Sequence, residues 1–252
     1  MCKTLPMMKH TSKFVFPITL VTVVAIAFSV FRMRQAMTAE QILARMAEVY
    51  AGCKSYRDTG TVKSTAVKDT FNRSIDGTFT TAFIRPDRFR FEFKGTMGTR
   101  LPSGEVRSVE MHYIAWRKGQ EISTWYNRRP GIEKAESLSM AIAAVAGISG
   151  GSATINAEML LPEELKGSVL LTDMTEVTRI GDAVVNEVDC YCITGKWVDR
   201  ATTIWIDRKT FLVRGIIWKA DAGDGMTIES TTSWEPAIGK EISEDELDFK
   251  AP

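Results

Sequence analysis

One segment of this chain has the residue types and spacing of a known catalytic turn. Residues 147–151 read Gly-Ile-Ser-Gly-Gly and match Gly-x-Ser-x-Gly, the turn that exposes the nucleophile of many serine hydrolases. That turn needs a strand before the serine and a histidine later in the chain. Here an apolar helical segment precedes the serine, and no histidine follows His112. The glycines are therefore predicted to end a helix.

The other reactive side chains lack the partners that their chemistry requires. His112 stands between Met111 and Tyr113 in a predicted strand, and a zinc site or a catalytic triad needs further groups that the sequence does not supply. The segment 221–224 is too short for a calcium loop. An enzyme would need two carboxylates that converge in a cavity. The sequence predicts no enzyme activity, no metal and no cofactor.

Three cysteines follow the first helical segment, and two outcomes are open for them. Cys190 and Cys192 are two positions apart in a strand predicted over residues 184–194, so they share one face and are badly placed to bridge each other. Either of them could bridge Cys53. The alternative is three free, buried thiols.

The amino-terminal segment, residues 1–37, is predicted to be a signal peptide or a membrane anchor. Lysines precede an uncharged run over residues 14–31, and Arg32 and Arg34 follow it. The small residues of Ala25-Ile-Ala27 favour cleavage, whereas the length of the run approaches the roughly 20 residues of a membrane span. A buried core helix is a further alternative. We expect an exported protein, in the periplasm or on the periplasmic face of the inner membrane, with membrane contact through this segment.

The charge of the chain argues against nucleic acid as a partner. There are 32 Lys and Arg residues against 31 Asp and Glu residues, for a net charge of +1. A phosphate-binding surface of the nucleic-acid type needs a basic excess, so no such partner is predicted.

The rest of the chain alternates between helical and strand patterns. Thr38 and Gln41 have the form of a capping box that opens a helix over residues 39–51. Period-two patterns predict strands over 59–67, 75–84, 89–93, 109–116 and 121–126, with a loop over 95–104. Small apolar residues predict a helix over 137–148, and a second helix is expected over 157–165, split by Pro162. Strands resume from 170 to 234, with hairpin turns at 207–210 and 221–225, and a last helical turn follows at 243–246.

This order predicts one α+β domain over residues 38–252. It would be built on a single, strongly curved antiparallel sheet, an incomplete β-barrel, and the helices would cover its concave face. Aromatic side chains occur in most of the predicted strands and would form the sheet core. Loosely packed helices of small residues would leave an apolar cavity beneath residues 137–148. Its predicted ligand-binding residues are Phe79, Phe83, Phe91, Trp116, Trp125, Met140, Ile142, Trp205 and Trp218.

Several strings also resemble one known group of proteins. They are Ser55-Tyr-Arg-Asp-Thr-Gly60, Arg85-Pro-Asp-Arg-Phe-Arg90, Gly147-Ile-Ser-Gly-Gly-Ser152, Leu160-Leu-Pro162, the run from Trp205 to Arg214, and Phe249-Lys-Ala-Pro252. Together they are similar to the LolA-like superfamily of outer-membrane lipoprotein carriers and sorting proteins, nearest to an uncharacterised exported branch. The resemblance covers residues 38–252. It implies a half-barrel whose cavity takes acyl chains and whose helical lid is held by an arginine. Arg57 and Arg73 are the candidates for this arginine, because they lie in the half of the chain where it is expected.

Two functions follow from these patterns. The first is a non-enzymatic cell-envelope protein that binds a lipid or a lipoprotein acyl chain in the apolar half-barrel cavity. The alternative is a membrane-anchored envelope sensor or adaptor that binds a protein partner. The ligand, the partner and the pathway are not readable from the sequence.

Overall fold

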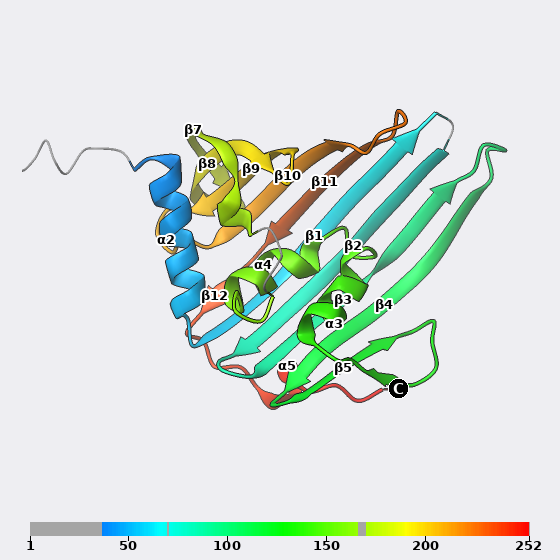
Figure 1. Ribbon diagram of the computed structural model, residues 1–252, viewed down its shortest axis with the longest axis horizontal. Helices are drawn as coiled ribbons and strands as arrows, with labels where there is room; N and C mark the ends of the chain where they lie inside the picture. Colours follow the sequence, from blue (N-terminus) through cyan, green and yellow to red (C-terminus); the bar gives the residue numbers. More distant parts are fainter. Residues whose placement is uncertain (1–36, 70, 166–169, 252) are drawn as a thin grey trace, which may run out of the picture. The chain divides into compact units, whose positions relative to one another are not determined.

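The centre of the molecule is one open antiparallel sheet of 12 strands (Figure 1). The computed structural model describes residues 37–69, 71–165 and 170–251. The strand order is β6-β5-β4-β3-β2-β1-β11-β10-β9-β8-β7, and β12 pairs with β1 beside this path. The two outermost strands, β6 and β7, do not pair with each other, so the barrel is incomplete. The predicted fold class is confirmed.

The strands fall into two groups that the central helices separate along the chain. The first group is β1 (Ser55–Lys68), β2 (Phe71–Ile84), β3 (Arg88–Arg100), β4 (Val106–Lys118), β5 (Glu121–Tyr126) and β6 (Ile132–Lys134). The second is β7 (Thr175–Val185), β8 (Val188–Trp197), β9 (Arg200–Asp207), β10 (Val213–Asp221), β11 (Thr227–Trp234) and β12 (Ala237–Ile238). Pairing of β1 with β11 joins the two groups into one sheet.

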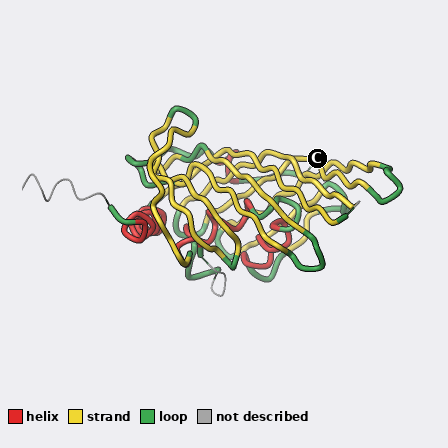
Figure 2. Tube along the Cα trace, turned by 90° about the horizontal axis from the view of Figure 1, so that it is seen from above, coloured by secondary structure: helices red, strands yellow, loops and turns green. Residues whose placement is uncertain are grey.

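The helices are short and begin where the sequence provides caps. α2 (Ala39–Gly52) starts with the predicted capping box of Thr38 and Gln41. α3 (Leu138–Ala146) starts with a hydrogen bond from the Met140 N–H to the Ser137 side chain. α4 (Ser152–Leu160) follows two glycines with positive φ, Gly150 and Gly151. The 3₁₀ turn η1 spans Leu171–Asp173, and α5 (Glu244–Leu247) is a single turn near the carboxyl end. Figure 2 shows the helices gathered mainly on one side of the strand layer.

The core lies between this helix-covered face and the sheet. Side chains alternate along each strand, so Phe89, Phe91 and Phe93 of β3 share the helix-covered face and are at most 1% exposed. Arg88 and Arg90 alternate with these residues and point to the opposite face. In-register neighbours continue the aromatic layer, because Phe79 lies opposite Phe93 and Phe83 lies opposite Phe89. We call this side the concave face and the other the outer face.

The last residues of the chain pack on the outer face. Arg88 of β3 forms ion pairs with Glu244 at 2.7 Å and Asp248 at 3.0 Å. The Phe249 ring contacts Trp116 and Trp125, with centroid separations of 5.4 and 5.2 Å. The carboxyl-terminal segment therefore shields part of the outer face.

Three predicted boundaries need correction. Residues 95–100, predicted as a loop, continue β3, because Gly95 and Gly98 pair with both β2 and β4. The predicted helix over 157–165 lies instead at Ser152–Leu160, since Pro162 stops it from continuing. The predicted strand over 184–194 is interrupted by a turn at Asn186 and Glu187, both with positive φ. Val184 therefore belongs to β7, and the two cysteines belong to β8.

The three described cysteines, Cys53, Cys190 and Cys192, are free and buried. The Cys53 Sγ donates to the Tyr50 carbonyl at 3.2 Å at the end of α2. Burial raises the pKa of all three thiols, that of Cys190 to about 11. The structure therefore shows the second of the two outcomes that the sequence left open.

The amino-terminal prediction concerns residues 1–37, of which all but Met37 lie outside the described residues. Within the described part, no helix combines the length and the apolar character that a membrane crossing needs. The residues from Thr38 onward form one compact unit.

One arginine connects two of the helices to the sheet. Arg85, directly after β2, donates from Nη2 to the Leu160 carbonyl at the end of α4 at 2.9 Å, and to the Tyr50 carbonyl of α2 at 3.4 Å. Its Nε donates to the Cys53 carbonyl at 3.1 Å. The last carbonyls of a helix have no partner inside the helix and carry partial negative charge, so a cation there is stabilising.

We predict that Arg85→Ala lowers the free energy of unfolding by about 1.5–3 kcal/mol, because three carbonyls lose a charged donor. Arg85→Lys should recover only part of this loss, since one ammonium cannot reproduce the planar fork. Urea unfolding followed by tryptophan fluorescence measures both changes. Arg100→Ala, at an exposed position at the end of β3, is the matched control and should change stability little. Equal stability of the Arg85 and Arg100 variants would contradict this role.

Candidate functional site

A cleft on the concave face lies where the cover provided by the helices ends. We call it the Trp218 cleft; its volume is about 360 Å³, within the range of small-ligand sites. Strands β1, β2, β9, β10 and β11 and the loop between α3 and α4 all contribute to it. Its lining residues are Ser64, Ala66, Arg73, Ile75, Ala146, Gly147, Gly150, Gly151, Thr154, Arg200, Trp218 and Ile228.

Sheet register explains why these side chains meet. Ile75 of β2 pairs with Ser64 of β1, Ser64 pairs with Ser230 of β11, and Ser230 pairs with Trp218 of β10. Paired residues of antiparallel strands point to the same face, so the four side chains form one row across the sheet. The row brings together residues that lie more than 150 positions apart in the chain.

The α3–α4 loop forms the boundary of the cleft because Gly150 comes very close to the sheet. A Cβ atom at Gly150 would lie 2.9 Å from Val62 Cγ2 and 3.3 Å from Ser64 Cβ, and the residue has φ +60°. Glycine is thus required both by space and by backbone conformation. On the sheet side of this contact Val62 is fully buried, and beyond it Ala66 and Ile228 are half-buried.

The walls of the cleft combine apolar surface with positive charge. Trp218 and Ile75 are 7% and 8% exposed and form its apolar floor together with Ala66 and Ile228. The Arg200 guanidinium lies 4.5 Å from the centre of the Trp218 ring, within the range of a cation–π contact. Within the described ranges of the chain, no carboxylate lines the cleft. This combination suits a ligand that has an apolar part.

A second concave cleft lies on the other side of α3 and is called the Tyr113 cleft. Its volume is about 320 Å³, and it is bounded by α3 and by the strands β4, β5 and β6. Tyr113 and Tyr126 line it with ring centres 5.8 Å apart, and Met140 and Ala144 line it from α3. Arg129, Glu133 and other polar residues complete it, so its lining includes a carboxylate, unlike that of the Trp218 cleft.

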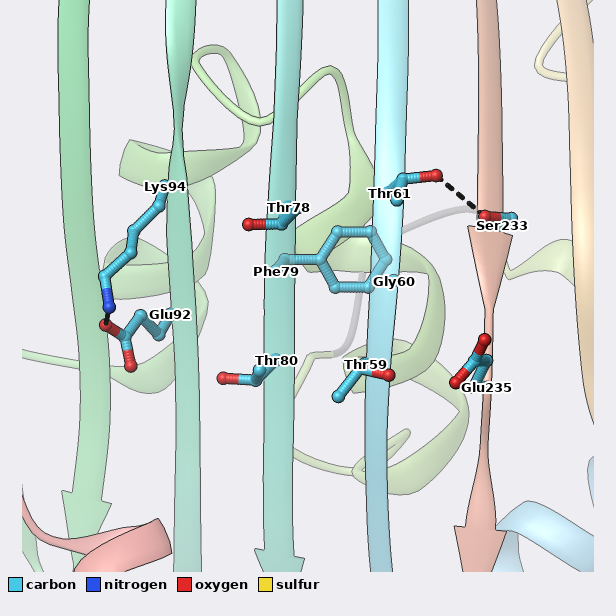
Figure 3. A pocket seen from close by; sticks show the side chains of 10 residues that line it. All are labelled: Thr59, Gly60, Thr61, Thr78, Phe79, Thr80, Glu92, Lys94, Ser233 and Glu235. Atoms are coloured by element: carbon cyan, nitrogen blue, oxygen red, sulfur yellow. Dashed lines mark hydrogen bonds and ion pairs between the residues drawn. The ribbon is translucent and has the colours of Figure 1, made fainter.

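A third cleft, on the outer face, is lined mainly by hydroxyl groups, as Figure 3 shows. Thr59 and Thr61 of β1 alternate with Asp58 and Gly60, which belong to the concave face, so the threonines point outward. The Phe79 ring lies against Gly60, where a Cβ would be 2.2 Å from it. Glu92, Lys94 and Glu235 also line this threonine cleft, so it contains carboxylates, unlike the Trp218 cleft.

The structure divides the residues that the sequence predicted as one site. Phe79, Phe83, Phe91 and Ile142 belong to the core beneath the helices and are at most 2% exposed. Trp218 lines the Trp218 cleft, and Met140, which is 56% exposed, lines the Tyr113 cleft.

Three predicted tryptophans lie on the outer face and do not share a cavity with α3. Trp116 and Trp125 contact Phe249 there, and Trp205 alternates with the fully buried concave-face residues Ile204 and Ile206. The physical reason is the period of two along each strand, which assigns neighbouring aromatic residues to opposite faces. We therefore place the candidate site beside the helices, in the Trp218 cleft.

A buried polar network fixes α4 next to this cleft. The Tyr56 hydroxyl donates to Asp58 Oδ2 at 2.6 Å, and Asn156 Nδ2 of α4 donates to the same oxygen at 2.9 Å. The backbone N–H of Thr81 donates to Asp58 Oδ1 at 2.9 Å. Burial raises the pKa of Asp58 to about 6, although these hydrogen bonds lower it. Three groups from β1, β2 and α4 thus depend on one carboxylate.

Sequence reasoning did not identify Arg200, Asn156 or the anchoring role of Arg85. Of the two arginines proposed for the lid, Arg57 pairs with Glu246 at 3.1 Å on the outer face, and Arg73 lines the Trp218 cleft. The sequence shows only that Arg85 follows the end of a predicted strand. Which helix ends meet there depends on tertiary structure.

The structure shows which side chain His112 contacts. Its Nε2 lies 2.8 Å from Glu92 Oε1 on the outer face, and Glu92 also pairs with Lys94 at 2.7 Å. Among the described residues, no group of three or more His, Cys, Asp or Glu side chains is placed to hold a metal ion.

Comparison with family models and with curated proteins finds no match for this chain. Solved structures do resemble it in fold. LprF from Mycobacterium bovis has 15% identity and a TM-score of 0.42, over 81% of this chain and 94% of its own. A LolA superfamily protein from Nitrosomonas europaea has 11% identity and a TM-score of 0.29, over 85% of this chain and 99% of its own.

The MucA/MucB complex of Pseudomonas aeruginosa is also similar, at 13% identity and a TM-score of 0.37, over 84% of this chain and 61% of the matched chain. At such identities these similarities concern the fold alone, and they assign neither a ligand nor a partner to this chain.

We predict that the Asp58 network makes stability depend on pH. The pKa of Asp58 is about 6 in the folded protein and 3.8 is its ordinary value, so the folded state binds this proton more tightly. The stabilisation that Asp58 contributes is therefore fully present below about pH 4 and is lost as the pH rises through about 6. The change in the free energy of unfolding is about 3 kcal/mol.

Asp58→Asn should remove this dependence, and urea unfolding at pH 4.5 and pH 7.5 would detect the difference. Asp76→Asn, on the outer face of the neighbouring strand in an exposed ion pair with Lys63, is the matched control. Unfolding curves of Asp58→Asn that keep the pH dependence of the parent protein would refute the assignment.

Proposed function

We propose that residues 38–252 form a non-enzymatic domain of the cell envelope that binds a lipid or lipoprotein acyl chain in the Trp218 cleft. The observation that carries this proposal is an apolar floor at the edge of the helix cover, formed by Trp218, Ile75, Ala66 and Ile228. Each methylene that leaves water there contributes about 0.8 kcal/mol. A cleft of this size accommodates part of one chain, and the ligand extends from it.

The concave face provides the space for that extension. Figure 1 shows that β1 to β4 continue well past α3 and α4. In this part of the sheet Met97 of β3 and Val109 of β4 lie in register with Ile75 and are half-buried. An acyl chain that leaves the cleft along this row would cover further apolar surface. Binding along an exposed row needs no opening of the packed core.

The absence of a catalytic role is part of the same proposal. The lining residues of the Trp218 cleft include no carboxylate, histidine or cysteine, and Ser64 and Thr154 have no base beside them among these residues. Activation of a hydroxyl nucleophile requires such a base. Export to the envelope is proposed from the pattern of residues 1–37.

A protein-binding role is the second candidate, and one feature of the sheet supports it. β7 is an outermost strand whose second edge pairs with no other strand of the described residues, and its Ile180 and Val184 are 60% and 69% exposed. A free edge with exposed apolar side chains can accept an added strand from a partner. Sequencing the amino terminus of the protein from cells separates the two roles. A retained segment over residues 14–31 favours the anchored adaptor, and its removal favours the carrier.

We predict that a bulky residue at Ala146 blocks acyl binding. Ala146 lines the Trp218 cleft from the end of α3, so Ala146→Trp should reduce labelling of the full chain by a diazirine fatty acid about tenfold or more. Labelling in envelope membranes is quantified by mass spectrometry of the cross-linked peptides.

Two variants of the same helix serve as controls. Ala143→Trp is at an exposed position that lines neither concave cleft, and Ala144→Trp fills the Tyr113 cleft instead. Both should keep the labelling of the parent protein. Loss of labelling in Ala144→Trp alone would move the acyl site to the Tyr113 cleft, and equal labelling of all variants would rule out both clefts.

A further inference from the structure

The Trp218 cleft contains two arginines whose charge no carboxylate neutralises. Arg73 donates from Nε to the Met97 sulfur at 3.0 Å, a weak acceptor, and Arg200 lies over the Trp218 ring. In the part of the chain that the structure describes, neither has a carboxylate within ion-pair distance. By contrast, Arg88 and Arg214 form ion pairs with carboxylates at 2.7 and 2.8 Å.

The third positive element of the cleft is the start of α4. Gly150 and Gly151, with φ of +60° and +86°, lead into this nine-residue helix, and no side chain caps it. Gly151 and Thr154 both line the cleft. The first N–H groups of a helix carry partial positive charge and favour an anion.

A buried hydroxyl group beside the cleft points to the same kind of ligand. Ser230 is 1% exposed, and its Oγ has no hydrogen-bond partner among the described residues. In the sheet it lies between Ser64 and Trp218, which both line the cleft. A buried hydroxyl without a partner is destabilising, and a ligand oxygen would offset that cost.

We infer that the Trp218 cleft selects amphiphiles whose headgroup is an oxyanion, a carboxylate or a phosphate, over neutral amphiphiles of the same chain length. This inference rests on the proposed acyl binding and adds the charge of the ligand to it. Charges of one sign between apolar walls are poorly screened and concentrate counter-ions. The arginines lie on β2 and β9, on either side of Trp218, so the field extends across the whole cleft.

The test compares two diazirine probes on the full chain in envelope membranes at pH 7.5: a long-chain fatty acid and the alcohol of the same chain. In the parent protein the acid should label peptides around residues 64–75, 146–154 or 218–228 about tenfold more than the alcohol. Arg73→Gln with Arg200→Gln should remove the preference, so that the acid and the alcohol label the cleft to the same extent. Arg100→Gln, outside the cleft, is the matched control.

The outcomes separate this inference from the function on which it rests. Equal labelling by both probes, unaffected by the arginine changes, would overturn the charge selection while acyl binding stands. No labelling of the cleft by either probe would overturn acyl binding itself. Inorganic phosphate added at the concentration of the acid should not protect the cleft. Protection at that concentration would show a site for free anions and overturn the selection of amphiphiles.

Discussion

The arrangement of this molecule depends on how two helix ends are held at one point of the sheet. Arg85 places a single guanidinium against the last carbonyls of α2 and α4, beside the end of β2. Both helices present the negative ends of their dipoles there, and without a cation these ends would repel each other. The contact holds the ends of α2 and α4 next to the end of β2. The packed core and the extent of the helix cover follow from that position.

The buried carboxylate of Asp58 attaches α4 to the sheet at a second point. This attachment has a free-energy cost, because the carboxylate is buried. Its hydrogen bonds to Tyr56, Thr81 and Asn156 fix the direction of α4, while its burial makes ionisation unfavourable. An apolar contact of the same size would bind α4 without such a cost, but it would not specify one orientation. We interpret the network as a device that positions the start of α4 at the Trp218 cleft.

The two faces of the sheet differ in what they offer to other molecules. The outer face carries threonines, ion pairs such as Arg88 with Glu244, and the carboxyl-terminal segment. The concave face is apolar and aromatic, and strands that are longer than the helices leave part of it uncovered. The proposed binding site for an acyl chain lies at the edge of that cover, where an apolar row continues while the helices end. Binding of an acyl chain at this edge would not require a large internal cavity.

Local patterns in the sequence determined most of the elements. The capping box at Thr38, the alternation through Phe89, Phe91 and Phe93, and the glycine-rich turns predicted helices, strands and hairpins, and their order predicted the fold class. Errors occurred where pairing overrides local preference, as at Gly95, which two neighbouring strands hold in β3. The same patterns showed that aromatic residues occur throughout the sheet, but not which ones share a face with α3.

Only the tertiary structure decided where the candidate site lies. Trp218 meets Ile75 through β1 and β11, and that row depends on the register of three strand pairs, of which β1 with β11 joins distant segments. A shift of one residue in any pair would turn these side chains to the other face. The meeting of Arg73, Arg200 and the start of α4 in one cleft has the same origin. Sequence periodicity specifies the two faces of each strand, and long-range pairing specifies which residues of different strands become neighbours.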